Sequence, residues 1–257
     1  MPQVMHPRVR PRRTEPRRPA RPDMKDYYAQ RLSAQQLQRC YEIAPPRVRR
    51  YLDAEIKHVL ARIGASDAVL ELGCGYGRVL ERLAARAEAL VGIDTSASSL
   101  QAARRFLSAF PNCRILEMDA AALEFPDQTF DVVVCIQNGI SAFHVDQRTL
   151  IAESIRVTRP GGRVLFSSYS ERFWQQRLEW FRLQSDHGLL GEIDWNATRD
   201  GTIVCKDGFK ATTVAPDEFR SLTAGFNVRR RIEEVDESSV FCELVPQERP
   251  QESSRLQ

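Results

Sequence analysis

The stretch AVLELGCGYGRVL, residues 68–80, decides the fold of this chain. It begins with five residues that are apolar apart from Glu71, a composition typical of a strand covered on both faces in a parallel sheet. Three alternating glycines follow, and glycine permits positive φ angles and the close approach of a ligand. A helix is predicted to begin at Arg78, with the positive end of its dipole facing the turn. The sequence therefore predicts a nucleotide-type pocket.

The spacing of the glycines separates two kinds of nucleotide site. A dinucleotide site requires G-x-G-x-x-G, but counting from Gly73 the third glycine would stand where the chain has Arg78. The pattern is instead Glu71-x-Gly73-x-Gly75-x-Gly77. A dehydrogenase is therefore not favoured. The pattern resembles motif I of the class I S-adenosylmethionine-dependent methyltransferases, and the resemblance implies that Glu71, Gly73 and Gly75 bind this cofactor.

The next predicted strand, ALVGI at 89–93, ends in Asp94, about twenty residues after the glycine turn. A carboxylate at this place can accept hydrogen bonds from both hydroxyls of an adenosine ribose. The alternative role for Asp94 is a helix N-cap, but Thr95 and Ser96 can supply that cap themselves. We therefore expect Asp94 and Thr95 to belong to the cofactor site.

Two further strands carry the resemblance. The strand at 113–117 is followed by Asp119 and Ala120, the place where methyltransferases hold the adenine ring with an acidic side chain and a backbone N–H. The fourth strand, at 132–136, is rich in valine and is led by a Phe-Asp pair, as in the family. Its carboxyl end carries Gln137, which completes the expected cofactor site.

The C-terminal part supplies the remaining strands. Arg-Pro-Gly-Gly at 159–162 precedes an apolar strand at 163–168, and it resembles the turn that leads into the family's fifth strand. The strands at 227–235 and 239–245 read as an antiparallel hairpin. The predicted fold class is α/β: a Rossmann-like class I methyltransferase fold, with a seven-stranded, mostly parallel sheet that ends in a C-terminal antiparallel hairpin and is flanked by helices.

The domain organisation follows from these assignments and from composition. The Arg/Pro-rich start has almost no apolar residues and is expected to be disordered, as is the polar C-terminus. The predicted segments are a disordered tail at 1–23, an N-terminal cap helix at 24–45, a methyltransferase domain at 46–246 with an insertion at 170–215 as a candidate substrate lid, and a disordered tail at 247–257.

The resemblance implies an enzyme that transfers a methyl group by in-line displacement to a small-molecule N, O, C or S acceptor. Such a transfer depends mainly on positioning and on excluding water, and no catalytic base need be visible. His144 is the candidate base, with a structural or solvated histidine as the alternative. Asn138 is the candidate substrate contact. Tyr28 and Tyr41 are candidates for contact with the methionine end of the cofactor, with ordinary packing as the alternative.

The insertion carries six aromatic residues that read either as a lid over a small, partly apolar substrate or as an ordinary core stripe. They are Phe173, Trp174, Trp180, Phe181, Trp195 and Phe209.

Composition limits the other functions. The six cysteines form no C-x-x-C pair, which favours reduced thiols in the cytoplasm and no metal site. No apolar run approaches the roughly 18 residues that span a bilayer, and no signal-peptide core follows the first charges. The net charge is +5 over residues 1–23 and −2 over the rest, so nucleic acid is not the expected partner. The oligomeric state is left open.

Three alternatives to a small-molecule methyltransferase remain. An RNA methyltransferase would use the basic tail, and its affinity would fall steeply with salt. A cofactor-binding partner protein would have no transferase activity. A methylase of trivalent arsenic would bring cysteines to the pocket, with Cys40, Cys74 and Cys135 as candidates.

Overall fold

A computed structural model of the chain describes Tyr27 and residues 34–248. The predicted tail at 1–23, the aromatic candidate Tyr28 and most of the C-terminal tail lie outside these residues. Within the described part, no helix is both long enough and apolar enough to cross a membrane.

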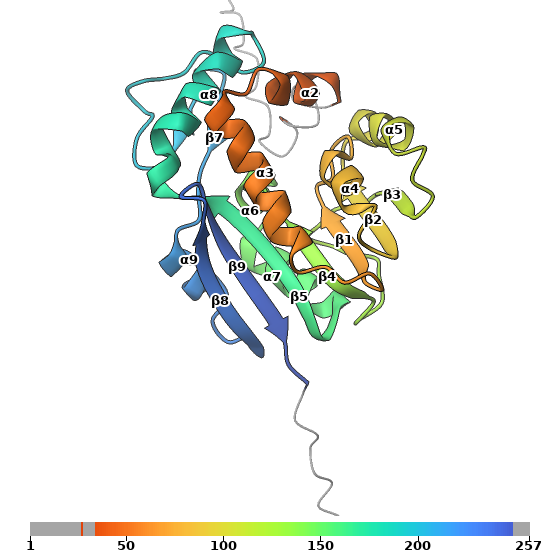
Figure 1. Cartoon of the computed structure of the whole chain (residues 1–257). Coiled ribbons are helices and arrows are strands. Elements are labelled where there is room, and N and C mark those ends of the chain that lie inside the picture. Colours follow the sequence, from red (N-terminus) through yellow and green to blue (C-terminus); the bar gives the residue numbers. More distant parts are fainter. Residues whose placement is uncertain (1–26, 28–33, 249–257) are drawn as a thin grey trace, which may run out of the picture.

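A seven-stranded sheet forms the centre of the fold (Figure 1). Its strand order is β3-β2-β1-β4-β5-β9-β8, with parallel pairing from β3 to β5 and antiparallel pairing of β9 with both β5 and β8. The strands are β1 (Ala68–Leu72), β2 (Ala89–Asp94), β3 (Cys113–Glu117), β4 (Phe130–Cys135), β5 (Thr158–Tyr169), β8 (Val228–Val235) and β9 (Ser239–Pro246). This confirms the predicted fold class and the C-terminal hairpin.

Helices cover both faces of the sheet and its upper end in Figure 1. They are α2 (Gln35–Glu42), α3 (Pro46–Leu60), α4 (Arg78–Leu83), α5 (Ala97–Phe106), α6 (Gly139–Ala142), α7 (Gln147–Val157), the 3-10 helix η1 (Glu171–Phe173), α8 (Trp174–Asp186) and α9 (Pro216–Leu222). A small separate hairpin pairs β6 (Ile203–Val204) with β7 (Lys210–Ala211).

Two apolar layers result from the buried strands. Helices α3, α4 and α5 pack on one face through residues such as Ile56, Leu80 and Leu100. On the other face α6, α7 and α9 pack through residues such as Leu150 and Phe219. The continuous apolar runs of the strands reflect this coverage on both sides.

Helix α3 belongs to two layers at once. Its C-terminal half, with Ile56 and Val59, packs on the sheet. Its N-terminal half, with Tyr51 and Leu52, joins a third cluster formed with α2, α8 and the β6–β7 hairpin. Figure 1 shows α2 and α8 beyond the end of the sheet toward which β1 and β5 point. This third cluster therefore forms a cap over the carboxyl ends of the parallel strands.

The structure corrects several predicted boundaries. The sequence pattern after the glycine turn predicts a helix that runs to Ala87, but α4 ends at Leu83. The short helix α6 is an element that the sequence pattern does not indicate. Strand β5 begins at Thr158, because the Arg-Pro-Gly-Gly turn lies within the strand at a register shift opposite β4. The sequence at 201–214 predicts a further hairpin around Asp207-Gly208, but this segment forms only the two-residue strands β6 and β7.

Candidate functional site

A cavity of about 370 Å³ opens at the carboxyl ends of β1, β2 and β4. In an open α/β sheet this is where ligands bind, at the point where the strand order reverses. Here β1 lies between β2 and β4. From β1 the chain adds β2 and β3 on one side, and it then returns to add β4 and β5 on the other side. We call this cavity the main pocket.

The glycine turn forms the floor of the main pocket, and it accepts no side chain at Gly73. Its φ is 71°, in the left-handed region, and a Cβ built there would lie 2.5 Å from the ring of Phe143. Gly75 also has a positive φ of 54°, and a Cβ there would approach Leu37 of α2 to 2.9 Å. Glycine is therefore required because side chains from two other elements close over the turn.

Asp94, at the end of β2, holds the turn in place. Its Oδ2 accepts a hydrogen bond from the backbone N–H of Gly75 at 2.9 Å, and its Oδ1 accepts one from the N–H of Ser96 at 2.8 Å. Ser96 caps α5, since its side chain accepts from the N–H of Ser99. The N-cap is thus supplied by Ser96, and the Asp94 carboxylate remains in the pocket wall with one further lone pair on each oxygen.

Glu71 and Arg78 face the same pocket from the two ends of the glycine turn. The Oε2 atom of Glu71 is buried and finds no hydrogen-bond partner among the described residues, nor do Nε and Nη2 of Arg78. Burial raises the pKa of Glu71 to about 8, against the opposing effect of the Arg78 charge. The pocket therefore holds one buried acceptor and two buried donors that await a ligand, since such atoms are costly to leave unpaired.

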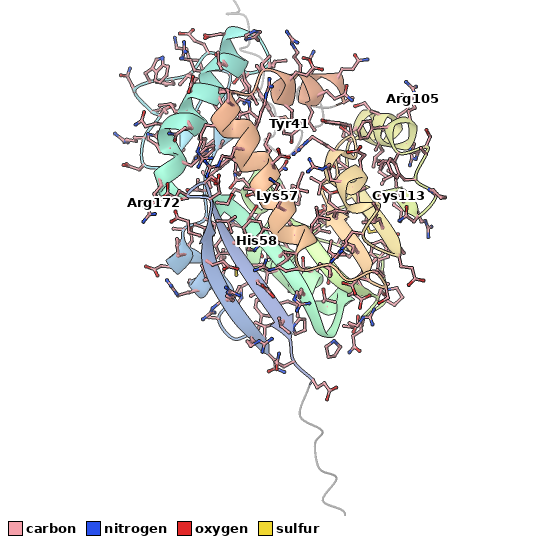
Figure 2. The ribbon with its side chains drawn as sticks, viewed as in Figure 1. Tyr41, Lys57, His58, Arg105, Cys113 and Arg172 are labelled. Carbon is pink, nitrogen blue, oxygen red and sulfur yellow. The ribbon has the colours of Figure 1, made fainter. Side chains whose placement is uncertain are left out.

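Tyr41, from α2, covers this end of the pocket. The guanidinium carbon of Arg78 lies 4.3 Å from the centre of its ring, within the range of a cation–π contact. Its hydroxyl donates to Oε1 of Gln137 at 3.3 Å. Figure 2 shows Tyr41 at the upper end of the sheet, on the side of α2 that faces α4 and α5. Burial raises the pKa of Tyr41, so the phenol stays protonated at neutral pH.

A smaller cavity of about 90 Å³ adjoins the main pocket under the cap. The two share Leu37, Tyr41, Gln137 and Ala142 as lining residues. We call it the cap pocket. Its remaining lining residues are Cys40, Tyr51, Leu52, Asn138, Tyr169, Trp180, Phe181, Gln184, Phe209 and Ala211.

The structure brings together every residue predicted for the cofactor site. All eight line the main pocket: Glu71, Gly73, Gly75, Asp94, Thr95, Asp119, Ala120 and Gln137. Thr95 and Asp119 are exposed at its rim, and Asp119 accepts a hydrogen bond from the N–H of Ala121 at 2.8 Å.

The two predicted acceptor-side residues lie elsewhere. Asn138 lines the cap pocket, where its amide is engaged by the chain: Oδ1 accepts from Ser168 at 2.8 Å and Nδ2 donates to the carbonyl of Thr212 at 3.0 Å. His144 is half-buried with φ 51°, and it lines neither cavity, although its neighbours Phe143 and Val145 line the main pocket. Asn138 therefore stays a prediction for substrate contact, with its amide held by the chain, and His144 stays a prediction for the base at a position outside both cavities.

The aromatic residues of the insertion occupy different positions. Trp180, Phe181 and Phe209 line the cap pocket. Phe173 is fully buried against Tyr51, with 5.0 Å between ring centres. Trp195 is 57% exposed. Trp180, Phe181, Phe209 and Phe173 also belong to the third buried cluster, so these four rings are core residues, and a lid role for the first three stays a prediction.

Sequence reasoning missed three polar residues. The pattern indicates Arg78 only as the start of a helix, although its side chain faces the pocket. Tyr51 and Glu55 are fully buried on α3. The signal was present for Glu55, because it falls on the apolar stripe through Leu52 and Ile56, where a carboxylate is not expected without a partner.

Comparison with known proteins agrees with the geometry. Residues 69–162 match the family model described as "Methyltransferase domain". The chain is 37% identical over 112 residues to a ubiquinone biosynthesis O-methyltransferase of Pseudomonas fluorescens, covering 42% of this chain and 47% of that protein. It is 29% identical over 168 residues to an arsenite methyltransferase of Aquipseudomonas alcaligenes, covering 60% of this chain and 47% of that protein. The chain thus spans about half the length of the relatives it matches.

Among solved structures, the fold is similar to that of the N-methyltransferase NodS from Bradyrhizobium japonicum in complex with S-adenosylhomocysteine. The TM-score is 0.56 at 17% identity, covering 88% of this chain and 99% of that one. A protein of Pyrococcus horikoshii gives a TM-score of 0.59 at 21% identity, covering 84% and 100%. At this level of identity the likeness shows the fold.

Proposed function

We propose that this chain, whose residues 69–162 match the family model described as "Methyltransferase domain", is a class I methyltransferase that transfers the methyl group of S-adenosylmethionine to a small molecule. The observation that carries the proposal is that Glu71 and Arg78 line the same pocket, each with buried atoms that have no hydrogen-bond partner among the described residues. A buried acceptor and buried donors without partners in one pocket are complementary to the ammonium and the carboxylate of an amino acid. S-adenosylmethionine ends in such a group, whereas NADH does not.

The rest of the main pocket fits the nucleoside. The Asp94 carboxylate, held by the N–H groups of Gly75 and Ser96, would accept the ribose hydroxyls with its free lone pairs. Asp119 and Ala120, at the rim, would hold the adenine. A cavity of about 370 Å³ lies within the usual range for cofactor and small-molecule sites.

The chain's contribution to methyl transfer would be to orient the reactants and to exclude water. The sulfonium of the bound cofactor supplies an activated methyl group, so the protein needs no covalent intermediate. Tyr41 closes the end of the pocket near Arg78, and Gln137 and Ala142 separate the main pocket from the cap pocket. An acceptor in the cap pocket would meet the cofactor at this boundary.

The acceptor is expected to be small, because the cap pocket measures about 90 Å³. The relatives with matching segments are named as methyltransferases of ubiquinone biosynthesis and of arsenite. For a trivalent arsenic substrate, thiolates would have to converge, yet Cys40 lines the cap pocket and Cys74 the main pocket. Burial raises the pKa of Cys40 to about 12, which keeps this thiol protonated. An organic acceptor is therefore favoured.

The test compares two ligands by calorimetric titration: S-adenosylhomocysteine, and 5′-methylthioadenosine, which lacks the amino-acid end. Arg78→Gln should weaken binding of the first about tenfold or more, since a charge-assisted hydrogen bond contributes about 1.5–3 kcal/mol, and should leave the second within about twofold. Asp94→Ala should weaken both. Arg82→Gln is the matched control, because that side chain pairs with Asp53 on the surface.

Two outcomes would refute the proposal. One is a parent protein that binds NADH but neither adenosine ligand. The other is an Arg78→Gln variant that weakens both adenosine ligands equally, because the amino-acid end would then not be held by this pair.

A further inference from the structure

Two consecutive residues shortly after β4 have left-handed backbone angles. The φ angle is 57° at Gln137 and 65° at Asn138, and the N–H of Gly139 donates to the carbonyl of Ile136 across them at 3.2 Å. Turns with two left-handed central residues favour glycine, asparagine or aspartate at both positions. Glutamine has no such preference, so its backbone must be held here by the surroundings. Residues held in this way are concentrated at functional sites.

The backbone N–H of Gln137 is held by side chains from two other elements. It donates to Oε2 of Glu55 on α3 at 2.7 Å, and Ser167 Oγ on β5 lies 2.8 Å from the same nitrogen. Both Glu55 and Ser167 are fully buried. A carboxyl group is costly to bury, and a hydrogen bond to a charged acceptor is stronger than one between neutral groups. The chain thus keeps a buried carboxyl group in contact with one backbone N–H of this turn.

Asn138 is held in a similar way by β5 and by the segment that follows β7. Ser168 donates to its Oδ1 at 2.8 Å, and its Nδ2 donates to the carbonyl of Thr212 at 3.0 Å. The backbone N–H of Val214 in turn donates to Ser168 Oγ at 2.7 Å. Neighbouring groups therefore fix both residues of the turn.

The turn lies between the two pockets. Gln137 lines both of them, and Asn138 lines the cap pocket. Helix α6 begins directly after the turn, and its Gly139 lines the main pocket while its Ala142 lines both. A shift of the turn would therefore move the wall that separates the main pocket from the cap pocket.

This wall is connected to the cap and to the glycine turn. The Tyr41 hydroxyl of α2 donates to Oε1 of Gln137 at 3.3 Å. Phe143, directly after α6, lies so close to Gly73 that no Cβ could be placed there. The backbone position of Gln137 therefore influences the surroundings of a ligand in either pocket.

We propose that Glu55 is a positioning residue for methyl transfer: it holds the N–H of Gln137, and through it the wall at which the cofactor meets the acceptor. Glu55 lines neither pocket, so it acts through Gln137. This inference rests on the proposed function, which places the nucleoside and the amino-acid end elsewhere in the main pocket and leaves the sulfur at the boundary with the cap pocket.

The surroundings of Glu55 allow its contact with Gln137 to be followed by pH. Burial raises the pKa of Glu55 to about 7, opposed by the nearby hydroxyls of Ser239 and Ser167, by the Gln137 N–H and by the charge of Arg78. Three other titratable groups interact with it, and burial raises the pKa of each, so they stay neutral while Glu55 titrates. They are Tyr51 on α3, Cys135 on β4 and Tyr169 on β5.

The first experiment compares two substitutions of similar size by calorimetric titration of the full chain. Glu55→Gln keeps an oxygen that can accept from Gln137, whereas Glu55→Met fills the same space without one. Glu55→Met should weaken S-adenosylhomocysteine and 5′-methylthioadenosine about tenfold each, because both carry the sulfur. Glu55→Gln should stay within about threefold of the parent. Lys57→Met, an exposed substitution on the same helix that is labelled in Figure 2, is the matched control.

The second experiment follows the backbone amide of Gln137 by NMR in the ligand-free full chain. As pH rises through the pKa of Glu55, the acceptor becomes charged and the hydrogen bond strengthens, so the amide proton should move downfield with an inflection near pH 7. Glu55→Gln should remove this inflection. A residue that only fills space would produce no such signal. This measurement also tests the contact if Glu55→Met does not fold.

The outcomes separate the two proposals. If neither adenosine ligand binds the parent, the proposed function fails, and the amide titration still tests the contact of Glu55 with Gln137. If both ligands bind the parent and bind Glu55→Met equally well, the positioning role is wrong. It is also wrong if Glu55→Gln loses as much affinity as Glu55→Met, or if the Gln137 amide shift shows no inflection that depends on Glu55.

Discussion

The guanidinium of Arg78 lies 4.3 Å from the centre of the Tyr41 ring. This contact joins α2 of the cap to α4, directly above the glycine turn. Arg78 thus touches the cap and lines the main pocket, and its Nε and Nη2 have no hydrogen-bond partner among the described residues. The cap and the predicted amino-acid site are therefore connected through one side chain.

Replacing Tyr41 separates the contribution of its ring from that of its hydroxyl. Tyr41→Leu should weaken S-adenosylhomocysteine binding by about five- to thirtyfold, because a desolvated cation–π contact contributes about 1–2 kcal/mol and the Arg78 side chain loses its support. Tyr41→Phe keeps the ring and loses only the 3.3 Å hydrogen bond to Gln137, so its effect should stay within about threefold. Equal losses in the two variants would contradict a role for the ring. Calorimetric titration distinguishes the cases.

Glu71 should make cofactor affinity depend on pH. Its pKa of about 8 means that the free protein carries a proton there at neutral pH, whereas a ligand ammonium favours the charged carboxylate. Binding therefore releases a proton, and affinity should rise between about pH 6 and about pH 7.5, by at most roughly tenfold per pH unit. The measurement is calorimetry in buffers of different ionisation enthalpy. Glu71→Gln should bind more weakly and show no such proton release; a parent that releases no proton would contradict this prediction.

The same raised pKa affects the stability of the ligand-free protein. Between pH 4.5 and about 8 the folded chain binds the Glu71 proton more tightly than the unfolded chain does. The free energy of unfolding should therefore fall as pH rises through this window, as far as Glu71 contributes to it. Chemical denaturation of the parent and of Glu71→Gln at several pH values should show a smaller decline in the variant. Identical slopes would show that the raised pKa is not realised.

The glycine turn allows a controlled test of shape. Gly73→Ala forces a residue with a Cβ into φ 71° and places that Cβ 2.5 Å from the Phe143 ring. Gly161 has φ 79° with nothing within 4 Å, so Gly161→Ala carries only the backbone cost of about 1–2 kcal/mol. Gly73→Ala should lose more stability than this, and should lose ligand binding as well. Thermal unfolding should show part of the loss restored in Gly73→Ala/Phe143→Ala.

The cysteines should react slowly in the native protein. All six are free, and five of them are buried. Cys113 is the one that is only partly buried. Desolvation still raises its pKa to about 11, so its thiol also stays protonated at neutral pH. A native sample treated with an aromatic disulfide reagent should label Cys113 first, and Cys113→Ser should remove the early phase. A fast reaction at Cys40 would instead show that the cap opens readily.

The sequence predicts the sheet well because its signals are local. Each buried strand is a short apolar run, and the residues at its carboxyl end follow directly in the chain. Asp94, Asp119 and Gln137 can therefore be assigned to one edge of the sheet from the order of the strands alone. They follow the parallel strands β2, β3 and β4, whose carboxyl ends lie at the same end of the sheet.

The acceptor side cannot be predicted in this way, because it is assembled by packing between distant segments. Tyr51, Trp180 and Phe209 meet in the cap pocket only after the insertion folds back over α3. Asn138 is correctly placed at the end of β4, but left-handed backbone angles at Gln137 and Asn138 turn its amide toward Ser168 and Thr212. Backbone turns of this kind at residues other than glycine leave little trace in composition.

Helix α3 packs both on the sheet and in the third cluster, and this limits how a ligand bound under the cap could leave. Its C-terminal half is fixed to the sheet by Ile56 and Val59, and just beyond it Arg62 pairs with Glu233 and Glu243. A release motion that displaced α3 would have to break this layer, which corresponds to unfolding part of the core. Helix α2 is joined to its surroundings by the contact of Tyr41 with Arg78, by the hydrogen bond from Trp180 Nε1 to the Cys40 carbonyl and by Cys40 in the third cluster. Ligand exchange that leaves this layer intact would therefore have to displace the eight residues of α2 rather than α3.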